Sequence, residues 1–171
     1  MRNTGGTGFL LATGFYLAFS LTAFAQADSD VLPKEKTVAT HASGPFDVKI
    51  TPQTLLDQET AAGLGRMSLD KQYHGDLEAK ATGVMLTAST DVKDSGVYVA
   101  VERVTGTLKG RSGSFAMNHT GVMTRGKPEL KITVVPDSGT GQLAGLSGTM
   151  NIKIDNGKHF YEFDYSLPEG R

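Results

Sequence analysis

The sequence of 171 residues contains no cysteine. Disulfide bonds, thiolate catalysis and cysteine-ligated metal centres are therefore excluded. An excess of charge of one sign is also lacking. The chain has 18 acidic and 17 basic residues, and the two kinds are interspersed. Nucleic-acid-binding proteins concentrate lysine and arginine on one face, so this pattern argues against a nucleic-acid partner.

Several enzyme signatures are missing as well. The chain has no P-loop, no dinucleotide-binding fingerprint, no HExxH zinc motif and no Ser-His-Asp triad signature. Apolar residues spaced three and four apart are scarce after Gly44, which excludes helical bundles and doubly wound α/β folds. The sequence predicts one domain of ordinary size that needs no cofactor.

Glycine, by contrast, is frequent, with 21 residues, and two segments share its spacing. Residues 106–115 read GTLKGRSGSF and residues 141–150 read GQLAGLSGTM. The pattern predicts two similar hairpin corners, each made of a strand, a glycine turn and the start of a second strand. Glycine within strand-like sequence is typical of bends in a curled sheet, so the repeat favours a closed or nearly closed barrel.

The first 25 residues differ from the rest. Arg2 precedes an uncharged, largely apolar run, Phe9–Ala25, which ends in Ala-Phe-Ala. This pattern predicts a secretory signal peptide over residues 1–25, and a secreted or periplasmic protein with no membrane contact after cleavage near Ala25. An uncleaved anchor is the alternative, although the run is short for a bilayer ~30 Å thick. The polar residues 26–44 predict a flexible leader.

Alternation of apolar and polar residues begins after Pro45 and predicts eight strands. Residues 54–65 have no clear strand pattern and are compatible with a short helical turn or a loop. Asn156 and Gly157 predict a type I′ turn before the last strand. The predicted strands cover residues 46–51, 66–73, 76–90, 97–108, 112–124, 129–135, 150–154 and 160–167. Their short connections indicate an all-β fold, an eight-stranded antiparallel barrel of mostly meander connectivity over residues 45–168.

Four segments resemble a known family. They read GRMSLDKQYHGDLEA (65–79), YVAVERVTGTLKGRSGSFAMNHTGVMTRG (98–126), VVPDSGTGQLAGLSGTM (134–150) and NGKHFYEFDY (156–165). They are similar to the small bacterial proteins grouped as domain of unknown function 3224. The resemblance covers nearly all of residues 45–167 and implies a barrel of the allene oxide cyclase-like superfamily. The family carries no established activity, so the resemblance implies a fold but no reaction.

Two ionisable residues fall on strand faces that are otherwise apolar. Glu102 shares a face with Tyr98, and His119 shares a face with Phe115 and Met117. If these faces line the barrel, Glu102 and His119 could meet inside it as a general acid/base pair. A buried, hydrogen-bonded pair with a purely structural role is the alternative.

The interior of a barrel of this size holds side chains or one small ligand. We therefore expect an exported protein that binds a small, largely apolar molecule without catalysis. The ligand-binding candidates are Tyr73, Tyr98, Glu102, Arg111, Phe115, Met117 and His119. One alternative is an isomerase or cyclase of the allene oxide cyclase type, with Glu102 and His119 as the catalytic candidates. Another is an interaction module that associates with itself as a homo-oligomer.

His74, Asp76 and Glu78 are spaced two residues apart. If they belong to one strand, they lie on one side of it as three potential metal ligands. The apolar residues of opposite parity, Leu77, Ala79 and Ala81, indicate instead that the side with His74, Asp76 and Glu78 faces solvent. No metal is predicted.

Overall fold

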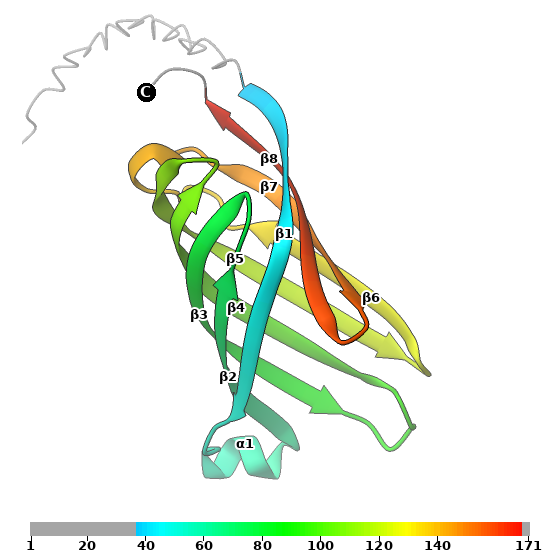
Figure 1. Cartoon of the computed structure of the whole chain (residues 1–171). Coiled ribbons are helices and arrows are strands. Elements are labelled where there is room, and N and C mark those ends of the chain that lie inside the picture. Colours follow the sequence, from blue (N-terminus) through cyan, green and yellow to red (C-terminus); the bar gives the residue numbers. More distant parts are fainter. Residues whose placement is uncertain (1–36, 169–171) are drawn as a thin grey trace, which may run out of the picture. The chain divides into compact units, whose positions relative to one another are not determined.

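The computed structural model describes residues 37–168. The predicted signal peptide and residues 26–36 of the predicted leader lie outside this range. Eight antiparallel strands close into a barrel in chain order, with β1 pairing to β8 (Figure 1). The elements are β1 Thr37–Pro52, α1 Asp57–Ala61, β2 Leu64–Tyr73, β3 Leu77–Ser89, β4 Gly96–Leu108, β5 Arg111–Thr124, β6 Lys127–Val134, the 3₁₀ helix η1 Gly141–Leu143, β7 Ser147–Asp155 and β8 Lys158–Pro168. The predicted all-β, eight-stranded antiparallel barrel is confirmed.

Strand β1 begins at Thr37, well before the predicted start at Pro45. The sequence predicts a leader through Gly44, but residues 37–46 pair with β8 and complete the barrel. Their sequence has little apolar alternation, so the strand is held mainly by backbone hydrogen bonds to β8. On its outer face, His41 lies 2.7 Å from a carboxylate oxygen of each of Asp164 and Glu162. The predicted leader is therefore too long at its C-terminal end.

The two glycine-rich segments form different structures. Residues 106–115 make the predicted hairpin between β4 and β5. Residues 141–150 do not, because they contain η1 and only the start of β7. The connection that carries η1 lies along β5, where the Thr140 N–H donates to the Ser114 carbonyl at 2.8 Å. It covers a strand edge that would otherwise be unpaired, and so the prediction of a second hairpin is wrong.

Two connections, residues 54–65 and the turn at Asn156 and Gly157, have defined local structures. The unassigned segment 54–65 contains the short helix α1, whose Glu59 accepts a hydrogen bond from the Leu56 N–H at 2.8 Å. Asn156 and Gly157 have positive φ values of 48° and 76°, as the predicted type I′ turn requires. Among residues 37–168, no helix has the length and apolar character needed to cross a membrane.

One half of the barrel interior, next to the β2–β3 and β4–β5 turns, is filled by large side chains. We call it the filled half, and Leu77, Leu108, Phe115 and Phe163 in it are at most 1% exposed. The rings of Phe115 and Phe163 stack with their centres 5.9 Å apart. Such close packing leaves this half no room for a ligand.

The other half of the interior, next to α1 and the β3–β4 and β5–β6 turns, is not filled. We call it the open half. Four apolar residues there share the inner strand faces with buried residues and are nevertheless 39% to 64% exposed: Ile50, Met123, Leu130 and Ile154. Strands β6 and β7 pair only at Ile132–Met150 and Thr133–Thr149, so they separate in this half. The barrel therefore ends in an apolar, accessible mouth.

Candidate functional site

Four polar side chains meet inside the barrel, between its filled and open halves. Lys71 and Tyr73 come from β2, Glu102 from β4 and His119 from β5. All four are buried, with at most 6% of each residue exposed. We call them the polar cluster. Ionisable groups at this depth are rare unless they are paired, so each contact within the cluster matters for its charge.

The Glu102 carboxylate is the centre of the polar cluster. Its Oε1 accepts hydrogen bonds from the Tyr73 hydroxyl at 3.0 Å and from His119 Nε2 at 3.2 Å. Its Oε2 lies 2.8 Å from Lys71 Nζ in an ion pair whose angles fall outside those of a hydrogen bond. Lys71 Nζ also donates to the Tyr73 hydroxyl at 3.4 Å and lies 5.5 Å from the centre of the Phe46 ring. Lys71 is thus held by a carboxylate and by aromatic faces.

The contacts determine the charges in the polar cluster. Burial would raise the pKa of Glu102, but the His119 hydrogen bond and the Lys71 charge outweigh it, and the pKa is lowered. Glu102 is therefore ionised at neutral pH. Burial, together with this negative charge, raises the pKa of Tyr73 well above its ordinary value. Tyr73 therefore keeps its proton, and its hydroxyl donates a hydrogen bond to the carboxylate.

Strand β3 makes the meeting of Lys71 and Glu102 possible. It lies between β2 and β4, and at this level its inner face carries only Ala81 and Gly83. A Cβ added to Gly83 would lie 2.7 Å from the Glu102 Cβ, closer than two carbon atoms can pack. The small residues of β3 leave the space through which the long Lys71 side chain reaches Glu102.

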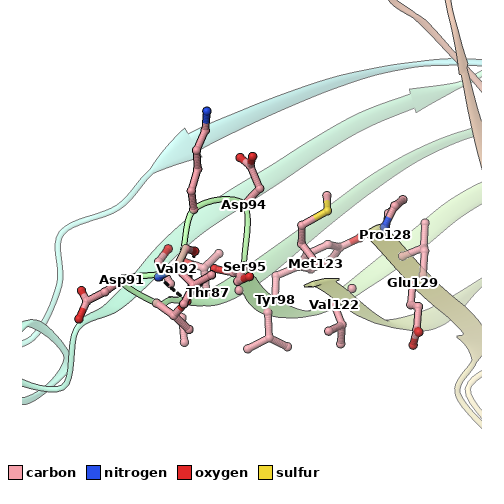
Figure 2. A pocket seen from close by; sticks show the side chains of 18 residues that line it. Thr87, Asp91, Val92, Asp94, Ser95, Tyr98, Val122, Met123, Pro128 and Glu129 are labelled. Atoms are coloured by element: carbon pink, nitrogen blue, oxygen red, sulfur yellow. Dashed lines mark hydrogen bonds between the residues drawn. The ribbon is translucent and has the colours of Figure 1, made fainter. Parts of the chain in front are cut away.

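Tyr98 lies between the polar cluster and the rim of the open half. Its ring covers Gly121 on β5, where an added Cβ would lie 2.0 Å from the Tyr98 Cε1 atom. Burial and the charge of Glu102 raise the pKa of Tyr98. Tyr98 also lines a pocket of about 610 Å³ at the barrel rim, together with Met123 and Leu130 (Figure 2).

The rim pocket does not reach the polar cluster. It is bounded by the β3–β4 turn and the adjoining ends of β5 and β6, and both inward-facing and outward-facing residues line it (Figure 2). Among the described residues that line it, none belongs to the polar cluster. Tyr98 lies between the two, because it lines the pocket and shares the inner face of β4 with Glu102.

The structure brings together some of the predicted site residues and separates others. Tyr73, Glu102 and His119 are in the polar cluster, and Tyr98 lies beside it. Phe115 and Met117 belong to the packed core of the barrel. Arg111 is exposed at the start of β5, next to the β4–β5 turn and therefore at the opposite end of the barrel from the rim pocket. These last three residues do not share a site with the open half.

Lys71 is the member of the polar cluster that the sequence analysis missed. Lys71 lies on the inner face of β2, between Leu69 and Tyr73. The signal that selected Glu102 and His119, an ionisable residue on an apolar strand face, is present at Lys71 too and would have identified it.

The three potential metal ligands do not share a strand. His74 and Asp76 lie in the β2–β3 turn and Glu78 lies on β3, so the single-strand arrangement is wrong. Asp76 instead accepts a hydrogen bond from the Ser43 N–H at 3.1 Å, and His74 Nδ1 lies 3.6 Å from Glu78 Oε2. Within residues 37–168, no three histidine or carboxylate side chains converge on a position that could hold a metal ion.

Fold and site together define a class of protein: a closed eight-stranded antiparallel barrel with a buried polar cluster below an apolar mouth. The chain belongs to the family described as protein of unknown function DUF3224, whose model matches residues 42–165. The resemblance noted in the sequence is thereby confirmed at the level of the family.

A solved structure supports the same assignment. A protein of unknown function from the DUF3224 family of Shewanella oneidensis MR-1 is 50% identical, with a TM-score of 0.71. The match covers 78% of this chain and 100% of that one. No curated protein matches this chain. The relation to the allene oxide cyclase-like superfamily stays a prediction, because neither description names it.

Proposed function

We propose that this barrel binds a small, largely apolar molecule in its open half and holds it without chemical change. The observation that supports this most strongly is the exposure of inward-facing apolar residues. Ile50, Met123, Leu130 and Ile154 lie on inner strand faces and are 39% to 64% exposed. Apolar surface that faces water inside a concave wall is the usual environment of a small-ligand site.

The strand pairing favours the same proposal. The backbones of β6 and β7 separate beyond Ile132 and Met150, so the wall of the open half is not closed by hydrogen bonds at this seam. The polar cluster lies deeper, and its carboxylate is paired with Lys71 and His119, so it provides a floor that an apolar molecule does not displace. Binding would cover the exposed inner side chains and remove them from water, which stabilises the complex.

A fluorescent probe tests the proposal. N-phenyl-naphthylamine is uncharged and apolar, and we expect it to bind the purified mature protein and raise its melting temperature. Leu130→Glu places a charge on the inner face and should weaken probe binding about tenfold or more. Val99→Glu is the matched control, since Val99 is similarly exposed but lies on the outer face of β4. Equal effects of the two variants, or no probe binding by the wild type, would contradict the proposal.

The contact between Glu102 and His119 favours a second candidate function, general acid/base catalysis by an isomerase or cyclase. A carboxylate that orients a histidine is a common catalytic arrangement. Turnover that Glu102→Gln or His119→Ala abolishes without unfolding the protein would support this function. The absence of turnover across a broad panel of unsaturated and carbonyl compounds would count against it.

Self-association is a third candidate, and the outer face of the barrel favours it. Five valines on β3, β4 and β5 face outward and are exposed: Val84, Val97, Val99, Val101 and Val122. An apolar patch of this kind is a common site of association between subunits. Light scattering of the mature protein distinguishes a monomer, which would contradict this function, from an oligomer.

A further inference from the structure

His119 uses one ring nitrogen in the polar cluster and leaves the other without a partner. Nε2 lies 3.2 Å from Glu102 Oε1, whereas no residue in the range 37–168 hydrogen-bonds to Nδ1. Among these described residues, Glu102 Oε2 is the only side-chain oxygen or nitrogen that is sealed from solvent and lacks a hydrogen bond. His119 Nδ1 is therefore not one of the sealed atoms of the described residues, although His119 as a whole is only 4% exposed.

The charge of Glu102 determines which nitrogen of His119 carries the proton. An ionised carboxylate has no proton, so it can only accept a hydrogen bond. The proton of that hydrogen bond must therefore be on Nε2. In the neutral ring, the proton on Nε2 leaves a lone pair on Nδ1, which makes Nδ1 a hydrogen-bond acceptor. Lys71 Nζ lies 2.8 Å from the other oxygen of the same carboxylate.

The strand register places His119 between Glu102 and the open half. Glu102 pairs with Met117, which places it on the filled-half side of His119. Nδ1 and Nε2 are separated by Cε1, and their bonding directions in the ring plane diverge, so a hydrogen-bond partner of Nδ1 occupies a different position from Glu102. Tyr98 and Gly121 lie on the open-half side of His119, and beyond them is the rim of the open half.

We propose that the apolar molecule bound in the open half carries one uncharged hydrogen-bond donor, a hydroxyl or N–H group, which donates to His119 Nδ1. This inference rests on the proposed binding function and adds the chemistry of its ligand. A carboxylate is disfavoured at this position, because it would bring a second negative charge and no proton to the Nδ1 lone pair. The selected compounds are therefore apolar alcohols, phenols or amines in their neutral form.

A matched pair of compounds tests the inference in the wild-type protein. Para-butylphenol and its methyl ether, para-butylanisole, have almost the same apolar body, but only the phenol has a donor. We expect the phenol to bind about tenfold more tightly by titration calorimetry, the effect of one well-made hydrogen bond. His119→Phe should remove this advantage, whereas Tyr98→Phe, which removes a hydroxyl but keeps the ring, should preserve it.

Nitrogen NMR of the His119 ring provides a readout that does not depend on a variant. The expected state is a proton on Nε2 and none on Nδ1, with an Nδ1 shift that moves when the phenol binds and does not move with the ether. Protons on both nitrogens, or equal affinity for the two compounds, would overturn this inference and leave the binding function standing. If neither compound binds and the naphthylamine probe does not bind either, the binding function itself fails.

Discussion

The filled and open halves of this barrel are built from the same strands, yet only one of them has a packed interior. In the filled half, large side chains such as Phe115, Phe163 and Leu77 meet across the interior. In the open half, Met123 and Leu130 have the same apolar character but are 39% and 40% exposed. The difference shows that inward orientation does not ensure burial. Burial also requires that the opposite wall be close enough to make contact.

The largest expected effect separates the two halves directly. Phe115→Ala removes a ring from the filled half and should lower the free energy of unfolding by about 3 to 5 kcal/mol. Met123→Ala, in the open half, should lower it by less than about 1 kcal/mol, because Met123 is already 39% exposed. Urea denaturation of both variants measures these losses. Similar losses for the two would mean that the open half is packed in solution.

The boundary between the halves depends on an ion pair. Lys71→Met removes the positive charge beside Glu102 and should lower the free energy of unfolding by about 3 kcal/mol, because it leaves a buried carboxylate without its cation. The double variant Lys71→Met with Glu102→Gln should recover much of this loss in the same denaturation experiment. A double variant that is less stable than Lys71→Met alone would contradict the ion pair as the reason.

The ionisation of Glu102 also predicts a pH dependence. Its pKa is lower in the folded protein than in the unfolded chain, so its contribution to stability is present above the ordinary glutamate pKa of about 4.3. That contribution is lost as the pH falls through the lower, folded value. Denaturation midpoints measured from neutral to acid pH should show this loss, and Glu102→Gln should reduce it. An unchanged acid profile in the variant would contradict the lowered pKa.

The smallest expected effect concerns the wall of the open half. Gly121→Ala places a methyl group where the Tyr98 ring lies, so we expect the ring to move and the free energy of unfolding to fall by about 1 to 2 kcal/mol. Because Tyr98 lines the rim pocket, affinity for the naphthylamine probe should change as well. Gly126→Ala is a control for side-chain contact, since no atom lies within 4 Å of an added Cβ there; its φ of +82° strains an alanine, so it should also lower stability, but without moving Tyr98. It tests whether probe affinity responds to Tyr98 or to any glycine substitution.

Part of the polar cluster was predictable from strand alternation. Glu102 and His119 were identified because each is ionisable on an apolar face, and Lys71 fits the same criterion. That Lys71 reaches Glu102 was not predictable, because the two lie on strands separated by β3. Their contact depends on the register that sets Ala81 and Gly83 between them.

The closure of the barrel shows a similar division. Residues 37–44 lack the alternation that marks a strand, and their pairing with β8 joins the two ends of the described chain. The segment 141–150 repeats the glycine spacing of the β4–β5 hairpin but does not form a hairpin. The connection between β6 and β7 instead hydrogen-bonds to the edge of β5 and contains the 3₁₀ helix η1. Neither outcome follows from local sequence, since each depends on a partner distant along the chain.

By itself, the sequence determined the fold class and seven of the eight strand positions to within a few residues. It could do so because side chains alternate along a strand and turns have local signatures. Only the tertiary structure decided which strand faces point inward, which half of the interior is filled, which ionisable groups touch and which nitrogen of His119 faces Glu102. Those properties depend on distances between strands, and such distances are set when the sheet closes on itself.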